Sequence, residues 1–83
     1  MNLTKDQAIA DVAAVLYMEP EELDLELDLR DQGIDSVRVM ELVERWRTAG
    51  VSEIDFIALA QDQRLSHWIT VLDELQQVPP AGP

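Results

Sequence analysis

The 83-residue sequence contains no cysteine, which excludes disulfide bridges, a thiol nucleophile and cysteine-based metal sites. It also has no apolar run long enough to cross a bilayer and no basic-then-apolar opening typical of a secretory signal. Basic residues are scarce: six oppose 17 acidic ones, for a formal net charge of −11. Such a surface repels nucleic-acid backbones and anionic membranes and attracts basic protein partners. We therefore expect a cytoplasmic, monomeric protein that binds neither nucleic acid nor membrane.

The spacing of the apolar residues predicts an all-α fold, a small four-helix bundle with three main helices and one short helix. The first helix opens with a capping-box pattern of Thr4 and Gln7 and ends before Pro20. The others are expected over about 36–48, over 54–60 (short) and over 65–75. We expect one domain over 1–77, followed by a disordered tail or linker stub over 78–83.

Between the first two helices, leucines alternate with acidic residues over 23–29. Alternation alone favours a strand, but leucine, aspartate and glutamate are poor strand formers and there is no second strand to pair with. We predict a long loop whose leucines pin it across the helices. The carboxylates do not fit a calcium-binding EF-hand loop in either possible register, so no metal site is predicted.

The most informative stretch runs from Gly33 to Trp46. A turn glycine leads into Asp35 and Ser36, either of which can cap the helix that follows. One face of this helix carries an apolar stripe that is expected to be buried, made of Val39, Leu42, Val43 and Trp46. Val37 and Met40 fall off that stripe and lie beside acidic residues, so this second face is expected to be exposed.

Catalysis by Ser36 is not expected. A nucleophilic serine needs a base and an oxyanion site, and the single histidine, His67, lies on the last predicted helix. The glycine-flanked serine elbow of hydrolases is also missing around Ser36. We therefore predict that the protein is not an enzyme.

The pattern Asp31-x-Gly33-x-Asp35-Ser36, followed by an apolar residue and a helix, resembles the attachment motif of phosphopantetheine-dependent carrier proteins. The resemblance implies that Ser36 bears a 4′-phosphopantetheine arm derived from coenzyme A, with Gly33 and Asp35 as supporting motif residues. It also implies modification by a phosphopantetheinyl transferase and a cargo held as a thioester. Because the chain has no cysteine, the thiol of the arm would be its only thiol.

Within the family, Gly-Ile-Asp-Ser departs from the Gly-Gly pattern of peptidyl carriers. The segments 36–40, 45–47, 54–56 and 59–60 are similar to aryl carrier proteins of siderophore-type non-ribosomal peptide synthesis. The resemblance then implies a salicylate-like or 2,3-dihydroxybenzoate-like cargo, an aryl- or acyl-adenylating enzyme that loads it, and a condensation or other acyl-transfer enzyme that receives it. The initial methionine and early helix start favour a free-standing protein over an excised domain.

Partner enzymes of this family contact the helix behind the serine and the short third helix. The residues that match these contact positions are Val37, Arg38, Met40, Glu41, Glu44, Phe56 and Ala60. Core packing explains Phe56 equally well. Two other functions stay open: an acyl carrier for polyketide or fatty-acid chains, and an unmodified acidic helical protein-binding domain.

Overall fold

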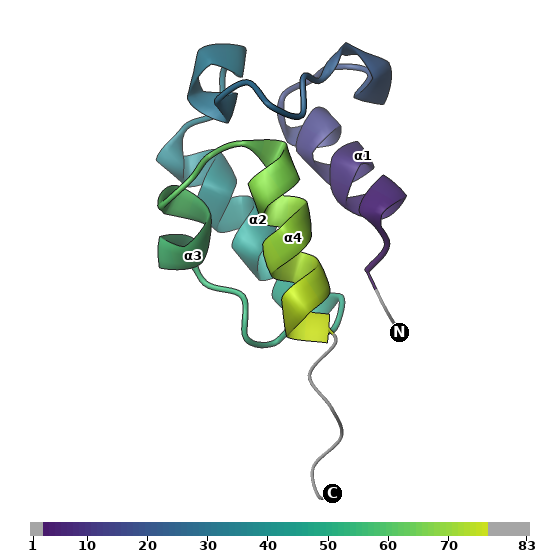
Figure 1. Cartoon of the computed structure of the whole chain (residues 1–83), viewed down its shortest axis with the longest axis vertical. Coiled ribbons are helices and arrows are strands. Elements are labelled where there is room, and N and C mark those ends of the chain that lie inside the picture. The colour runs from purple at the N-terminus through teal and green to yellow at the C-terminus, as the bar shows by residue number, and fades with distance from the viewer. Residues whose placement is uncertain (1–2, 77–83) are drawn as a thin grey trace, which may run out of the picture.

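The computed structural model describes residues 3–76, which form an all-α bundle (Figure 1). Within that range the chain has four α-helices and no named strand: α1 Lys5–Val15, α2 Ser36–Thr48, α3 Phe56–Ala60 and α4 Leu65–Gln76. Two short 3₁₀ helices, η1 Pro20–Glu22 and η2 Leu29–Gln32, lie in the long first connection. In Figure 1, α2 and α4 run down the view and α1 runs up it. The predicted fold class is confirmed, and the predicted tail over 78–83 lies outside the described residues.

The start of α1 confirms half of the predicted capping box. The backbone N–H of Gln7 donates to Thr4 Oγ1 at 3.0 Å, which is the expected N-cap bond. The side-chain amide of Gln7 does not return to the cap but donates to Asp11 Oδ1 at 2.9 Å. The reciprocal part of the prediction is therefore wrong, because a buried carboxylate one turn further on takes the Gln7 amide.

The end of α1 comes earlier than Pro20 requires. The helix stops at Val15, and Tyr17 takes a left-handed conformation with φ 57°. The N–H of Met18 then donates to Ala13 O at 2.9 Å, the long bond of a Schellman motif. The backbone reversal, and not the proline, ends this helix.

The core is organised around two fully buried tryptophans. Trp46 of α2 and Trp68 of α4 meet edge to face, with ring centroids 6.2 Å apart and an angle of 80° between the planes. Trp68 Nε1 donates to Leu59 O at 2.8 Å, and Trp46 Nε1 donates to Asp11 Oδ2 at 2.9 Å. The core position predicted for Trp46 is confirmed. Asp11 was not predicted as a buried residue, because its sequence position alone does not reveal a partner 35 residues away.

The leucines of the first connection do not all pin it. Leu23 and Leu29 are buried and Leu25 is partly buried, whereas Leu27 is exposed. The prediction is therefore wrong for Leu27. The backbone supplies further anchors, because Leu29 N donates to Gln63 O at 2.7 Å and Ser66 N donates to Leu25 O at 3.0 Å.

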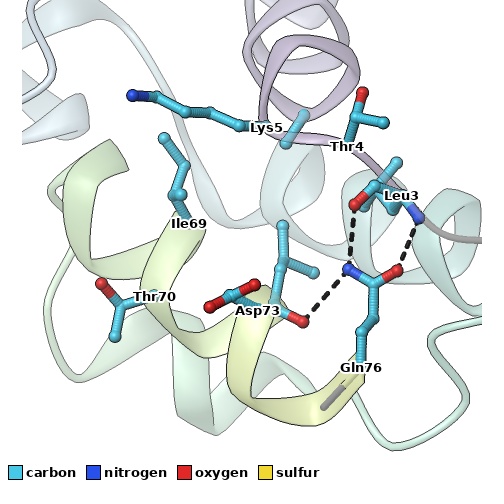
Figure 2. Close-up of a pocket in the computed structure, with 9 residues that line it drawn as sticks. Leu3, Thr4, Lys5, Ile69, Thr70, Asp73 and Gln76 are labelled. Carbon is cyan, nitrogen blue, oxygen red and sulfur yellow. Dashed lines mark hydrogen bonds between the residues drawn. The ribbon is translucent and has the colours of Figure 1, made fainter.

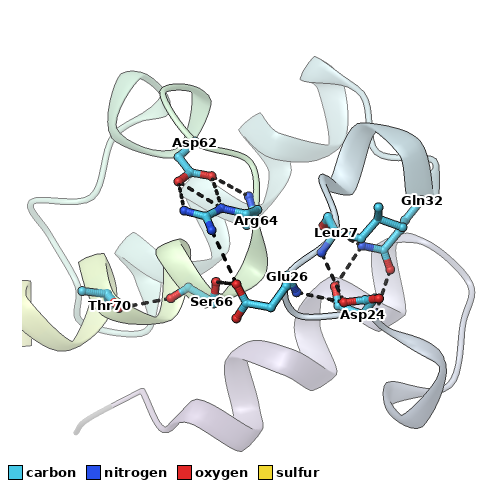
Figure 3. A network of polar contacts seen from close by, with 8 residues as sticks. All are labelled: Asp24, Glu26, Leu27, Gln32, Asp62, Arg64, Ser66 and Thr70. Atoms are coloured by element: carbon cyan, nitrogen blue, oxygen red, sulfur yellow. Dashed lines mark hydrogen bonds and ion pairs between the residues drawn. The ribbon is translucent and has the colours of Figure 1, made fainter.

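Arg64 ties this loop to the start of α4 (Figure 3). Its guanidinium lies 2.6 Å from Asp62 Oδ2 and 3.5 Å from Glu26 Oε1, and Ser66 Oγ donates to the same Glu26 oxygen at 3.1 Å. The hydrogen bonds from Arg64 lower the pKa of Asp62 to about 2. These contacts, together with the bond from Leu29 N to Gln63 O, hold the loop and η2 against the residues at the start of α4. The helix η2 then leads into the turn before α2.

Candidate functional site

The site begins at the turn between η2 and α2. Gly33 ends η2 with φ 109°, a left-handed conformation that glycine adopts without penalty. A Cβ added there would lie 4.0 Å from Leu16 Cδ2, so the backbone angle and not lack of space favours glycine. The next residue, Ile34, is buried and its N–H donates to Leu29 O at 3.0 Å. This turn fixes where α2 starts.

Asp35 is the N-cap of α2. Its backbone is extended, with φ −129° and ψ 176°, and its Oδ1 accepts from the N–H of Arg38 at 2.9 Å. Ser36 is the first residue of the helix and is exposed. Of the two cap candidates in the sequence, the structure selects Asp35. The hydroxyl of Ser36 has no hydrogen-bond partner within the described part of the chain.

The start of α2 provides a favourable place for an anion next to Ser36. The first-turn N–H groups of a helix have no partners inside the helix, and only one of them is taken here by Asp35. Together with the helix dipole, they stabilise a negative group by about 0.3–1 kcal/mol. A phosphodiester on this serine would benefit from both effects.

The structure confirms that one predicted face of α2 is buried and the other is exposed. The stripe of Val39, Leu42, Val43 and Trp46 is buried. On the other face Val37 is 68% exposed and Met40 is 48% exposed, and both acidic neighbours, Glu41 and Glu44, are exposed. Partner binding by these four residues stays a prediction.

The side chain of Arg38 is held by contacts with the end of α1, unlike the exposed side chains around it. Its Nε donates to Val15 O at 2.8 Å, and its guanidinium carbon lies 5.8 Å from the centre of the Tyr17 ring. Its Nη1 is 3.8 Å from the carboxylate of Asp35. The side chain was predicted to lie on the open face, but it is only 34% exposed and reaches back to α1. Partner binding by Arg38 stays a prediction.

The third helix is shorter than predicted. It begins at Phe56 and not at Ile54, because Asp55 caps it: Asp55 Oδ1 accepts from Ala58 N at 2.8 Å. Ile54 is fully buried before the helix starts.

Of the two contact residues predicted on α3, Phe56 is partly buried against the core and Ala60 is partly buried. The exposed apolar side chain is Ile57, at 67%, which was missed. The signal was available: Phe56 and the buried Leu59 are three residues apart and face inward together, which turns Ile57 outward.

A cavity of about 330 Å³ lies between the start of α1 and the end of α4 (Figure 2). Its apolar wall is made by Leu3, Ala8, Ile69 and Leu72, and Gln76 closes one side by bonding both backbone groups of Leu3. None of its lining residues belongs to α2 or α3. The cavity is therefore separate from the turn that carries Ser36.

Within residues 3–76, no group of three or more histidine, cysteine, aspartate or glutamate side chains could hold a metal ion. None of the helices in this range combines the length and the apolar character needed to span a membrane.

Comparison with known proteins gives a family match over most of the chain. The profile of the family described as "Phosphopantetheine attachment site" matches residues 6–72. The acyl carrier protein ScoB of Streptomyces coeruleorubidus is 40% identical over 89% of this chain and 86% of its own length. An isochorismatase of Bacillus subtilis is 41% identical over 80% of this chain. The phenyloxazoline synthase MbtB of a Mycobacterium species is 36% identical over 87% of this chain.

The extent of these matches differs on the side of the relatives. This chain spans nearly all of ScoB, but only 21% of the isochorismatase and 6% of MbtB. A search of solved structures found no significant match.

Proposed function

This chain belongs to the phosphopantetheine-attachment family of carrier proteins, and on that premise we propose that Ser36 bears the arm and that its cargo is an aryl acid. Proteins of this family are not catalysts. They hold acyl or aryl groups on 4′-phosphopantetheine while other enzymes act on them.

The observation that carries the assignment of Ser36 is that this serine is not needed to cap the helix. Asp35 already caps α2, and Ser36 is an exposed residue whose hydroxyl makes no hydrogen bond within the described residues, so it is available for modification. The glycine turn places it at the first position of the helix, where a phosphate is favoured. Ser36 also lies within the residues that match the family.

The aryl cargo is supported by the way the bundle is filled. Trp46 and Trp68 occupy the interior between α2 and α4, which leaves little space there for a long acyl chain. The cavity between α1 and α4 has no wall from α2. One relative is named for a phenyloxazoline, a product that contains an aromatic ring. A small aromatic thioester that stays outside the bundle fits these features.

A second candidate, an acyl carrier for polyketide or fatty-acid chains, is favoured by one observation. ScoB is named an acyl carrier protein, and this chain spans 86% of its length. Loading of the modified protein with an aryl acid or with a fatty acid separates the two candidates.

We propose that three enzymes act on the exposed face of α2: a phosphopantetheinyl transferase, an adenylating enzyme, and a condensation or acyl-transfer enzyme. The apolar contacts would come from Val37 and Met40, with Ile57 of the neighbouring α3 as an addition. The acidic residues on α2 and the net charge of −11 would steer basic surfaces of these enzymes towards it. Since coenzyme A is the donor, we propose the cytoplasm as the location.

The test is intact mass after incubation with coenzyme A and a broad-specificity phosphopantetheinyl transferase. We expect a gain of one phosphopantetheine in the native chain and none in Ser36→Ala. Ser52→Ala is the matched control, because Ser52 is also an exposed serine and its loss should leave the gain intact. A gain in Ser36→Ala, or none in the native chain with an active transferase, contradicts the proposal.

The cargo is tested on the modified protein. We expect an aryl-adenylating enzyme to load salicylate or 2,3-dihydroxybenzoate, and an acyl–acyl carrier protein synthetase to load medium-chain fatty acids poorly. The reverse result would support the acyl carrier.

A further inference from the structure

The last turn of α1 lacks a cation of its own. The final carbonyl groups of a helix have no partners inside the helix and form the negative end of its dipole, where a positive side chain is stabilising. α1 has no basic residue in its last turn. Arg38 supplies one from α2, since its Nε donates to the carbonyl of Val15, the last residue of α1.

The residue after this helix end is unusual. Tyr17 has the left-handed backbone that glycine normally provides at this position, and its side chain is 87% exposed. Its ring faces the guanidinium of Arg38, 5.8 Å from centre to carbon, within the range of a cation–π interaction. An exposed aromatic residue in a strained conformation is explained if its ring has this task.

The same arginine is tied to the start of α2. Its own N–H donates to Asp35 Oδ1, and its Nη1 lies 3.8 Å from the other oxygen of that carboxylate. Arg38 thus links the cap of α2 to the end of α1, two residues from Ser36.

We propose that Arg38, covered by Tyr17, is a positioning residue that holds the first turn of α2 in the orientation a modifying enzyme requires. This inference rests on the proposed function, because it assumes that Ser36 is the residue modified. It also replaces direct partner contact as the main role of Arg38. The link joins segments 23 residues apart, and the N–H of Arg38 and that of Val39 both bond to Asp35, so loosening it exposes them to exchange.

The chain offers a matched control in Arg47. Its Nε donates to Ile54 O at 2.9 Å, and its Nη1 lies 3.8 Å from Glu44 at i−3, so its contacts copy those of Arg38 at the other end of α2. Replacing either arginine by methionine keeps the aliphatic stem and removes the guanidinium. Any difference between the two variants therefore reports position along the helix, and not the general loss of an arginine.

The experiment combines modification kinetics with amide exchange in the full chain. We expect Arg38→Met to lower kcat/KM for phosphopantetheine transfer by about fivefold, mainly through kcat, the factor expected for loss of one hydrogen bond. Exchange at the amides of residues 38 and 39 should rise by a similar factor. Arg47→Met should change both by less than about twofold, because the hydrogen bond and ion pair that it loses lie at the far end of α2, away from Ser36 and from the amides of residues 38 and 39.

Tyr17→Gly separates positioning from global stability. Glycine removes the left-handed penalty, so the midpoint of urea unfolding should stay the same or rise. We still expect faster exchange at residues 38 and 39, because the ring no longer covers the guanidinium. If Tyr17 acted only through global stability, an unchanged or higher urea midpoint would come with unchanged or slower exchange at residues 38 and 39, and that result would overturn its part in the proposal.

The remaining outcomes are also decisive. Slower modification of Arg38→Met with unchanged exchange would make Arg38 a direct contact for the transferase and overturn positioning. Unchanged kinetics would overturn it as well. If the native chain is not modified at all, the proposed function fails and the role towards Ser36 fails with it. The exchange measurement then still shows whether Arg38 orders the turn, so the two failures are distinguishable.

Discussion

Asp35 and Ser36 are neighbours with different roles, and this difference predicts how each one contributes to the free energy of unfolding. Asp35 is the cap of α2, and Ser36 is its exposed first residue, whose hydroxyl has no hydrogen-bond partner among residues 3–76. Removing the cap should therefore destabilise the domain, and removing the hydroxyl should not. The two neighbouring alanine variants should behave in opposite ways.

The magnitudes follow from the contacts. Loss of an N-cap bond costs about 1 kcal/mol, and loss of a carboxylate at a helix start costs a further 0.3–1 kcal/mol or so. The ion pair to Arg38, at 3.8 Å and partly exposed, adds little. We expect Asp35→Ala to lower the free energy of unfolding by about 1–2 kcal/mol, or roughly 5–10 °C in Tm for a domain of this size. Ser36→Ala should raise it by up to about 0.5 kcal/mol, because alanine is the better helix former.

The assay is urea unfolding followed by tryptophan fluorescence, since both tryptophans are fully buried. Asp35→Asn is the control, because it keeps the acceptor oxygen and should recover most of the loss. A loss of more than about 1 kcal/mol in Ser36→Ala would show that the serine is structural and refute the reasoning. So would native stability in Asp35→Ala.

Three further predictions concern the core, the loop and the surface. Asp11→Ala should lower the free energy of unfolding by about 2–3 kcal/mol, measured in urea, because it leaves the buried Nε1–H of Trp46 without an acceptor. The folded-state pKa of Asp62 is lowered from 3.8 to about 2, so its pairing with Arg64 should stabilise the fold fully above pH ~4. That contribution should be lost as the pH falls through about 2, and Tm measured against pH should lose this component in Arg64→Ala. Met40→Glu should slow phosphopantetheine transfer with unchanged Tm, since Met40 is exposed, and unfolding of this variant would show that the exposed face is assigned wrongly.

Local chemistry let the sequence predict the helix at the centre of the site. The bounds 36–48, the buried stripe and the stop before Gly50 are all confirmed. Gly50 has φ 117°, and Val51 N donates to Trp46 O as a glycine-ended helix predicts. These features depend on residues within one or two turns of each other, which is the range over which periodicity and capping are informative.

The motif before α2 also acts through contacts between residues that are close in sequence. Gly33 supplies the turn and Asp35 the cap, and both act within a few residues of Ser36. The sequence left open which of Asp35 and Ser36 caps the helix, because both side chains can accept the same bond. The backbone path through Ile34, anchored on Leu29, decided in favour of Asp35.

Only the tertiary structure decided which polar and apolar side chains leave their expected places. Asp11 is buried where it accepts a hydrogen bond from Trp46. Arg38 turns back towards α1 because its guanidinium donates to the carbonyl of Val15 at the end of that helix. Leu27 is exposed although Leu29, in the same alternation, is fully buried. Each of these outcomes depends on a contact, or on the lack of one, with a segment far away in the chain. A linear pattern records what one segment prefers, but burial and pairing depend on the segments that pack against it.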